Sequence, residues 1–518
     1  MEGTFWAFAP AIVAIVLALL TKQVYVSLFV GILTGALMFA GGNPLQALGT
    51  LYTVMSEAVG GNAPIIVFLV VLGIFVVLMQ KSGGSRAYGE WAEKKISSKS
   101  GALAATAGLG CLIFVDDYFN CLTVGSVMRP VTDKFKVSHS KLAWLIDSTA
   151  APVCIIAPIS SWAAAVSGQL EGNGLVVFMQ TIPFNVYAIL TIIMVFAVCF
   201  GKFDFGKMKK NEMIAEQTGD LNAGETDLPT DEDNSIVANP VGKVRHLIVP
   251  VIILILCCVG GMIYSGFFYN WDTGMYGTEI QSSNVIEAFS NCDAGTSLAI
   301  GSTIALILVS IYYMVEKVVS FKEITNSFTQ GFKTMVPAIL ILTFAWTISK
   351  IMGAKGGYLD AQAFVESNMS MIPESIKAFY PAIFFILACA IAFATGTSWG
   401  TFGVLVPIAV TILGGSGTLV FITVSATLGG AVFGDHVSPI SDTTILASTG
   451  GNCNHIDHVK TQLPYAALIA GISFVSYVVA GLLASFGGVV AGLVMWAVAI
   501  LLFAIVAFAI KATNKKKA

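Results

Sequence analysis

The chain reads Gly434-Asp435-His436-Val437-Ser438-Pro439-Ile440-Ser441-Asp442-Thr443-Thr444 between two long apolar runs. Two carboxylates, an imidazole and four hydroxyls therefore follow one another in an otherwise hydrophobic part of the chain. A charged side chain at membrane depth costs about 2.5–3.5 kcal/mol, so it normally faces a partner, a cavity or a transported ion. The Gly and Pro residues also interrupt helical hydrogen bonding and free backbone carbonyls, which a bilayer accepts only beside protein or a cavity. This combination indicates a cation site.

The composition around this stretch is that of a polytopic membrane protein. Of 518 residues, 56% are hydrophobic and 11% are charged, whereas a typical soluble domain has about 25% charged residues. Apolar runs long enough to span a membrane recur from residues 5–20 to residues 493–510, and they predict about 12 membrane segments, some of them broken. Residues 1–20 lack a basic start, so we expect them to form the first helix rather than a cleaved leader. We expect membrane lipid to surround the helices of such a chain. We expect no nucleic acid partner.

The distribution of charge predicts the orientation in the membrane, because basic residues mark the cytoplasmic side. They bracket an acidic stretch within residues 202–245 and end the chain at 511–517, whereas residues 265–297 contain acids but no Lys or Arg. We expect the protein in the inner (plasma) membrane of the cell. The linker and the C-terminus are expected on its cytoplasmic side. The polar composition of residues 202–245 predicts a flexible tether between a first membrane half, 1–201, and a second, 246–518.

The two halves repeat one order of features: an apolar helix, a polar break, a second apolar stretch and a proline. The break is Asp116-Asp117-Tyr118-Phe119-Asn120 within residues 101–128, and Thr395-Gly396-Thr397-Ser398-Trp399-Gly400-Thr401 within residues 379–413. Basic loops place both ends of the first segment inside, which predicts a re-entrant hairpin, and the same count makes the second a hairpin from the opposite face. The predicted fold is all-α, with two inverted repeats, re-entrant hairpins and broken helices, as in secondary transporters. The alternative is that both segments cross the membrane completely.

The second half supplies the main candidate ligands. Hard cations take oxygen from carboxylate, hydroxyl and carbonyl groups. We therefore expect Na+ at Asp435 and Asp442, which flank an unwound turn, with further oxygens from Ser438, Ser441 and Thr443. The alternative for the hydroxyls is helix capping around a kink. His436 is expected to share a proton with Asp435, or else to pack as a neutral side chain.

The hairpin breaks supply the remaining candidates. Asp116 and Asp117 are adjacent, so their carboxylates repel each other and compete for a proton or a cation; the alternative is an N-cap at Asp116 and a pair between Asp117 and Arg129. Hydroxyl and amide groups at the two tips predict contacts with a substrate or an ion, and they belong to Asn120, Thr123, Thr395, Thr397, Ser398 and Thr401.

Three further polar residues have weaker patterns. Asp147 precedes Ser148 and Thr149, but Lys141 is close enough in sequence to suggest an interfacial location. His455 and His458 are expected in a solvated cytoplasmic loop rather than at a metal. No nucleotide-binding pattern with its required context is present, so we expect transport driven by ion gradients, with Na+ as the transported or coupling ion, no cofactor and no enzymatic activity.

Residues 396–401 and 433–444 resemble the signatures of NhaC-type Na+/H+ antiporters, and so do residues 116–118, 129–133 and 147–152. The resemblance covers nearly the whole membrane part. It implies secondary active transport by alternating access, with Na+ and H+ competing for intramembrane Asp. Some members are thought to exchange malate for lactate or to carry amino acids, so Na+-coupled transport or exchange of an amino acid or small carboxylate is the alternative. His436 departs from the Lys that many members have, and a homodimer is an implication of the resemblance alone.

Overall fold

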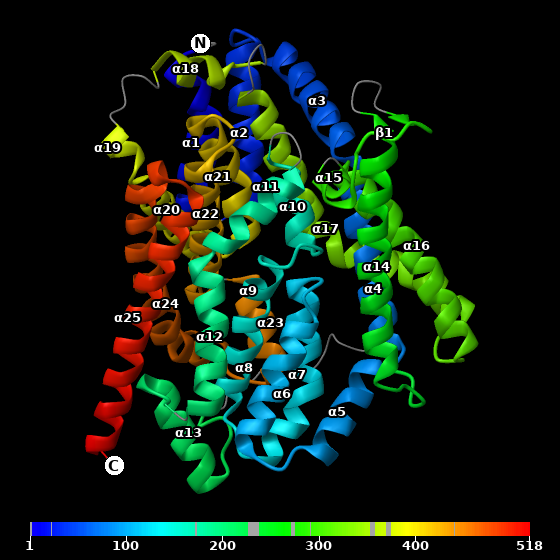
Figure 1. The fold of residues 1–518 in the computed structure, drawn as a ribbon, viewed down its shortest axis with the longest axis vertical. Helices are drawn as coiled ribbons and strands as arrows, with labels where there is room; N and C mark the ends of the chain where they lie inside the picture. The colour runs from blue at the N-terminus through cyan, green and yellow to red at the C-terminus, as the bar shows by residue number, and fades with distance from the viewer. Residues whose placement is uncertain are drawn as a thin grey trace.

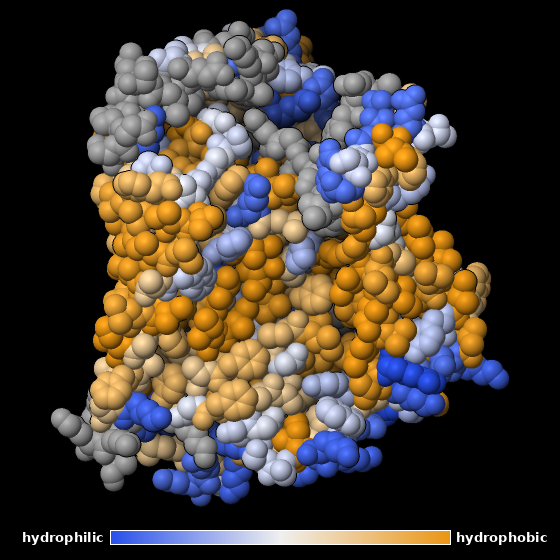
Figure 2. Space-filling model, in the orientation of Figure 1, coloured by the Kyte–Doolittle hydropathy of each residue, from blue (hydrophilic) through white to orange (hydrophobic). Residues whose placement is uncertain are grey.

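The computed structural model describes residues 3–21, 23–170, 174–201, 203–225, 238–270, 275–290, 292–352, 358–368, 374–439 and 441–517. Within these residues the protein is mostly helical, and one antiparallel pair of short strands joins β1 (Tyr269–Asn270) to β2 (Met275–Tyr276), with Tyr269 opposite Tyr276. On the face shown in Figure 2, apolar side chains form a broad band across the middle of the molecule, and hydrophilic residues gather toward its ends. Such a band is the surface that a bilayer covers.

The helices of the first half are η1 (Phe5–Phe8), α1 (Ala9–Thr21), α2 (Val24–Phe39), α3 (Pro44–Gly61), α4 (Ala63–Lys81), α5 (Gly84–Lys95), α6 (Lys99–Leu112), α7 (Asp117–Lys134), α8 (His139–Thr149), α9 (Ala151–Cys154), α10 (Ser161–Ser167), α11 (Gly174–Thr181), η2 (Ile182–Phe184) and α12 (Val186–Gly201). The linker contains α13 (Gly206–Thr218).

The helices of the second half are α14 (Arg245–Phe268), α15 (Val285–Ser290), α16 (Ala294–Val315), α17 (Phe321–Met352), α18 (Ala361–Asn368), α19 (Glu374–Lys377), α20 (Tyr380–Thr395), α21 (Ser398–Leu413), α22 (Thr418–Val437), α23 (Asp442–Gly451), α24 (His455–Leu483), η4 (Ala484–Phe486) and α25 (Gly488–Lys517).

Several of these helices are long and apolar enough to cross a membrane. In the part of the chain that the structure describes there are seven, namely α4, α12, α14, α16, α22, α24 and α25, and up to nine if each of two bent pairs counts as one span. The hairpin helices α20 and α21 are shorter apolar helices. The protein is thus a polytopic all-α membrane protein, as predicted, in which short and broken helices complete the set of about 12 segments.

Both predicted hairpins are present, each as two helices joined by a short break. Residues 113–116 separate α6 from α7, and Gly396 and Thr397 separate α20 from α21. Gly396 ends α20 at φ 67°, a conformation that glycine adopts without steric cost. The pair α6–α7 lies in the lower half of Figure 1 and the pair α20–α21 in the upper half, so the hairpins enter from opposite ends. This arrangement agrees with inverted repeats.

The ends of the molecule agree with the predicted topology. Helix α13 and the C-terminus lie at the lower end of the view, and β1 lies at the upper end (Figure 1). The linker and the C-terminus therefore share one face, and the acidic segment around residues 265–297 is on the other.

The linker differs from the predicted flexible tether. Helix α13 is folded and buries Asn211 and Glu212, which are 3% and 5% exposed. Glu212 lies 2.7 Å from Lys99 Nζ and accepts a 2.7 Å hydrogen bond from the backbone N–H of Ser138. Asn211 donates to Asp457 Oδ2 at 2.7 Å. The prediction of a flexible tether is therefore wrong for α13, whose polar side chains find partners on both membrane halves. Residues 226–237 of the linker lie outside the described residues.

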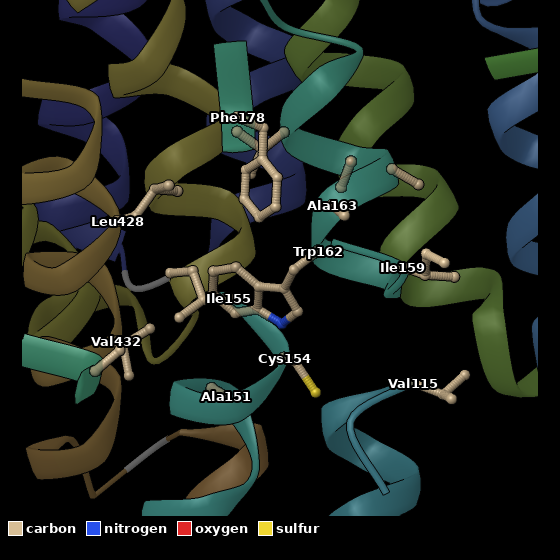
Figure 3. Packing of buried hydrophobic residues seen from close by; sticks show 14 of the residues in the cluster. Val115, Ala151, Cys154, Ile155, Ile159, Trp162, Ala163, Phe178, Leu428 and Val432 are labelled. Atoms are coloured by element: carbon tan, nitrogen blue, oxygen red, sulfur yellow. The ribbon is translucent and has the colours of Figure 1, made fainter. Parts of the chain in front are cut away.

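The core lies where the two halves meet. Trp162, which is fully buried, packs its ring against Trp399 and Phe402 of α21 at centroid distances of 5.6 and 5.0 Å. Figure 3 shows the indole of Trp162 between Phe178 and Cys154, with its nitrogen toward the side on which Cys154 lies. This aromatic layer, formed by Trp162, Trp399 and Phe402, lies beside the tip of the first hairpin.

Candidate functional site

The first hairpin tip is held by Asn120. Its amide nitrogen donates to the backbone carbonyls of Gly110, Ile113 and Thr149 at 2.7, 3.0 and 3.0 Å. These carbonyls belong to the end of α6, to the break and to the end of α8, so one side chain ties the turn to its neighbour. Asn120 was predicted to contact substrate; in the structure its donor group holds the hairpin.

Asp117 begins α7 and is fully buried. Its Oδ2 accepts hydrogen bonds from the indole N–H of Trp162 at 2.9 Å and from that of Trp399 at 3.4 Å. The two donors come from different halves of the chain. Arg129 follows 12 residues later in the same continuous helix, about 18 Å along its axis, so the geometry does not support the alternative pair between Asp117 and Arg129.

The neighbouring candidates at this tip are also buried. Asp116 is 1% exposed and Thr123 is 3% exposed. The backbone carbonyl of Asp116 accepts from the N–H of Asn120 at 3.0 Å, the first bond of helix α7. A carboxylate at a helix N-terminus is stabilised by the helix dipole, and the structure places Asp116 and Asp117 together at such an end.

A break between α22 and α23, which we call the second break, lies at residues 438–441 and contains Pro439, as predicted, whereas Gly434 lies within α22. Thr443 Oγ1 donates to Asp435 Oδ2 at 2.5 Å, and Asp435 is fully buried. Ser441 Oγ caps α23 by accepting from the N–H of Thr444 at 3.1 Å. Ser438 Oγ donates to the carbonyl of Phe393 in the second hairpin at 2.7 Å. The side chain of Asp442 lies outside the described residues.

Asp147 differs from its predicted interfacial location, because its side chain is fully buried where α8 meets α23 and α24. Gln462 Nε2 donates to its Oδ2 at 2.6 Å, and Thr444 Oγ1 donates to the same atom at 3.3 Å. Thr444 Oγ1 also lies 3.2 Å from the backbone carbonyl of Asp435. One hydroxyl of the second half therefore links Asp147 of the first half to the break that carries Asp435.

Two histidines lie close to the carboxylate of Asp147. His458 was predicted in a solvated loop, but it is buried in α24 with Nε2 3.4 Å from Asp147 Oδ2. His436 was expected beside Asp435; its Nδ1 instead lies 2.9 Å from the hydroxyl of Tyr187, and its Nε2 lies 4.0 Å from Asp147 Oδ1. Sequence reasoning missed Gln462 and His458 as partners, although their spacing of four puts both on one face of an apolar helix.

The hydroxyls of the second hairpin mostly bond to their own helices. Thr395 and Thr401 donate to the carbonyls of Ile391 and Thr397 at 2.8 and 2.9 Å. Thr397 Oγ1 caps α21 by accepting from Gly400 N–H at 3.3 Å. Ser398 Oγ is buried and has no hydrogen-bond partner within the described part of the chain. The tip therefore offers one uncommitted hydroxyl next to Trp399.

The buried carboxylates thus form two groups, Asp116 with Asp117 and Asp147 with Asp435, at the breaks where the halves meet. Among the described residues, no group of three or more His, Cys, Asp or Glu side chains could hold a metal ion. Oxygen ligands from single carboxylates, hydroxyls and carbonyls suit Na+ or a proton, which are transported rather than resident. This arrangement can bind a small cation within a hydrophobic protein.

Comparisons with known proteins agree with this chemistry. The chain matches the model of the Na+/H+ antiporter family over residues 163–482. A protein of Haemophilus influenzae described as uncharacterized is 39% identical over 499 residues, or 93% of this chain and 91% of that protein. A malate-2H+/Na+-lactate antiporter of Bacillus subtilis is 30% identical over 175 residues, or 33% of this chain and 34% of that protein.

Solved structures provide a likeness in fold. The YdaH transporter of Alcanivorax borkumensis superposes with a TM-score of 0.50 at 14% sequence identity, and the match covers 85% of this chain and 89% of that chain. At this identity the likeness concerns the fold alone. The family model matches more than half of the chain and decides membership: this chain belongs to the Na+/H+ antiporter family.

Proposed function

We propose that the protein exchanges Na+ for H+ by alternating access, with both ions competing for the buried carboxylates at the two breaks. The observation that carries this proposal is the position of Asp117: it is fully buried, and its Oδ2 accepts hydrogen bonds from indoles of both halves. A movement of one half relative to the other changes these contacts and hence the affinity of the carboxylate for a cation.

Competition supplies the coupling. A deprotonated carboxylate is a ligand for Na+, and bound Na+ opposes protonation of the same oxygen, so each ion displaces the other. Asp435 and Asp147 offer carboxylates for the same competition at the second break. The hydroxyl of Thr444 contacts Asp147 Oδ2 and the backbone carbonyl of Asp435 and so connects the two residues. The free energy for uphill movement comes from the ion gradients, without a bound cofactor and without enzymatic chemistry.

The proposed orientation places the linker and the C-terminus in the cytoplasm and the protein in the plasma membrane. Support comes from Lys and Arg on the face that carries α13 and the C-terminus, because short basic segments are retained on the cytoplasmic side.

A second candidate function is Na+-coupled exchange of a small organic solute. The relative from Bacillus subtilis, whose described substrates are malate and lactate, favours this candidate over part of its length. Ser398, with its uncommitted hydroxyl at the second tip, is a group that such a solute could contact.

The test is exchange in liposomes that contain a pH-sensitive dye, under a Na+ gradient without organic solute and with the voltage clamped by K+ and valinomycin. We expect Na+-driven proton movement that Asp117→Asn, Asp435→Asn and Asp442→Asn abolish, whereas Asp220→Asn, on the exposed linker, retains it. Wild-type-like exchange in all three core variants would contradict the assignment. Folded protein without any proton movement would favour the organic solute.

A further inference from the structure

One buried imidazole lies where several helix ends meet. His139 begins α8 and is 6% exposed. Its Nε2 lies 3.1 Å from Asp133 Oδ1, near the end of α7. Its Nδ1 lies 3.0 Å from the backbone carbonyl oxygen of Asn452, the C-cap of α23, and 3.1 Å from Asn222 Oδ1 in the linker. Both ring nitrogens therefore face oxygen atoms, which come from both halves of the chain and from the linker.

The contacts of His139 are complete only when its ring carries a positive charge. A backbone carbonyl, such as that of Asn452, and an ionised carboxylate, such as that of Asp133, accept hydrogen bonds but cannot donate them. A neutral imidazole has one N–H and would present a lone pair to the other acceptor, whereas the imidazolium ion has two N–H groups. Histidine is the side chain whose charge changes between about pH 5 and 8. The contacts at this ring thus depend on a proton in the physiological range.

The helices that meet at His139 are those that carry the ion site. Asp147 follows the ring by eight residues, or about 12 Å along α8. On α23, Thr444 precedes the C-cap by eight residues, which is again about 12 Å, and its hydroxyl contacts Asp147. Helix α7 begins with Asp117. One ring therefore joins the far ends of the three helices that present Asp117, Asp147 and Thr444.

These helix ends also pack closely against one another. A Cβ atom added to Gly451, the last residue of α23, would lie 3.0 Å from the Cβ of Ala143 in α8. A Cβ added to Gly450 would lie 2.7 Å from the carbonyl oxygen of Cys121 in α7. Closely packed interiors have low compressibility and transmit strain. A displacement at the ring would therefore be passed along α23 toward its hydroxyl groups.

The ring adjoins the face that carries α13 and the C-terminus. The backbone N–H of His139 donates to the carbonyl of Leu221, shortly after α13, at 2.9 Å. The side chain of Asp133 is 37% exposed, so the pair of Asp133 and His139 is in contact with the aqueous phase. Protons on this side of the protein therefore have access to the ring.

Charged and titratable groups on the surrounding elements have partners of their own. These are Glu212 with Lys99 and Lys141, Asp204 with Lys141, Asp457 with Lys207, Asp220 with the N–H groups of Asn222 and Gly224, Lys136 with the carbonyl of Glu216, and His455 with Ser448 and the carbonyl of Pro439. Asp133 is therefore the carboxylate that balances an imidazolium ion at His139.

We propose that His139 is a positioning residue for the ion site and that a proton from the cytoplasm completes its hold on α7, α8 and α23. This inference rests on the proposed exchange function and adds regulation to it. A proton that binds better to one arrangement of the helices shifts the equilibrium toward that arrangement. Alternating access requires the surroundings of the carboxylates to change, so protonation of His139 slows turnover without competing for the oxygens that bind the ion.

The first test is exchange of radioactive Na+ for Na+ in liposomes, with Na+ saturating on both sides and equal pH inside and outside. Saturation removes the competition between Na+ and H+ from the maximal rate, so the remaining pH dependence reports on turnover. We expect the wild-type rate to rise about fivefold or more from pH 6 to pH 8, the effect of one hydrogen bond that involves a charged group. His139→Gln, which is neutral at both pH values, should remove most of this rise.

A second variant and a control complete the test. Asp133→Asn keeps the imidazole but removes the charge that faces it, so it should also reduce the pH response, and its partly exposed position makes misfolding a lesser concern. His246→Gln replaces another buried histidine, at the start of α14, and should retain the pH response. Thermal unfolding in detergent adds a measurement without transport. His139→Gln should lower the melting temperature more at pH 6 than at pH 8, because the imidazolium contacts of the wild type are complete only at the lower pH.

Two results would overturn the proposal: a pH response of the maximal rate that both His139→Gln and Asp133→Asn retain, or an equal loss of melting temperature in His139→Gln at pH 6 and pH 8. Either result, with Na+-driven proton movement in the wild type, would leave the exchange function in place. A wild-type protein that moves no protons in response to Na+ would remove the exchange function and the regulation with it, and thermal unfolding would then still decide whether a proton holds His139 to its partners.

Discussion

Asp117 Oδ2 lies 3.4 Å from the indole nitrogen of Trp399, which follows it by 282 residues in the sequence. The contact joins the tip of one hairpin to the tip of the other, and Trp162 completes it with a 2.9 Å hydrogen bond to the same oxygen. Broken helices of inverted halves hold the ions in secondary transporters. We therefore propose that this contact transmits a change in one half to the carboxylate of the other.

Replacing Trp162 with Phe should change transport kinetics more than replacing Trp399. Each variant removes an N–H donor from Asp117 but keeps an aromatic ring, so the carboxylate holds a cation more tightly. We expect the apparent KM for Na+ and the maximal rate to fall together, by about tenfold for Trp162→Phe, and by less for Trp399→Phe because its bond is longer. Trp496→Phe, whose indole donates to the carbonyl of Pro183, is the matched control. A raised KM with an unchanged maximal rate would contradict this interpretation.

Replacing Thr444 with Val should uncouple Asp147 from the break that carries Asp435. The variant keeps the shape of the side chain but loses the hydroxyl that contacts both sites at 3.3 and 3.2 Å. We expect a loss of about 1 kcal/mol in unfolding free energy and a clear loss of exchange in liposomes. Thr449→Val, where the hydroxyl donates to the carbonyl of Ile445 in its own helix, should leave exchange intact. Equal rates in the two variants would exclude a role for this bridge.

Replacing Asn120 with Leu should loosen the first hairpin. The substitution removes a buried NH2 group whose two hydrogens are shared among three backbone carbonyls, at about 1 kcal/mol for each hydrogen. We expect a fall in unfolding free energy of about 2 kcal/mol, measured as thermal unfolding in detergent. Asn284→Leu removes an exposed contact, in which Asn284 Oδ1 accepts from the Glu287 N–H at 2.9 Å at the start of α15, and should cost only about 1 kcal/mol. A stable Asn120→Leu protein that loses only transport would instead support the original prediction of substrate contact.

Replacing Glu212 with Gln should destabilise the docked linker. Glu212 Oε2 lies 2.7 Å from Lys99 Nζ and 3.4 Å from Lys141 Nζ, and the side chains of Glu212 and Lys141 are only 6% and 3% exposed. Removing one partner of a buried ion pair costs about 3–5 kcal/mol. Glu216→Gln removes a pair with the same Lys99, but the Glu216 side chain is 58% exposed, so it should cost about 1 kcal/mol or less. Thermal unfolding compares the two variants, and similar melting temperatures would show that α13 is not held by this pair.

The order of the amino acids was enough to predict those elements of the protein that depend on neighbouring residues. Long apolar runs predicted membrane helices, because every backbone polar group in a bilayer must be satisfied within its own segment. Gly396 and Pro439 predicted where helices break, because glycine readily adopts a left-handed backbone conformation and proline has no backbone N–H to donate. The clustered Asp residues predicted buried polar sites, since their cost in a membrane requires a function.

Which of these groups meet depends on how the helices pack. Asp147 looked interfacial and His458 looked solvated, yet Asp147 is buried together with His458 and Gln462, which lie on one helix more than 300 residues later. The polar linker was expected to be flexible, but its helix α13 is docked: Glu212 pairs with Lys99, and Asn211 donates a hydrogen bond to Asp457. Hydropathy and turn chemistry are properties of neighbouring residues, whereas the partner of a buried polar group depends on how helices from the two halves pack, and that packing is fixed by the whole chain.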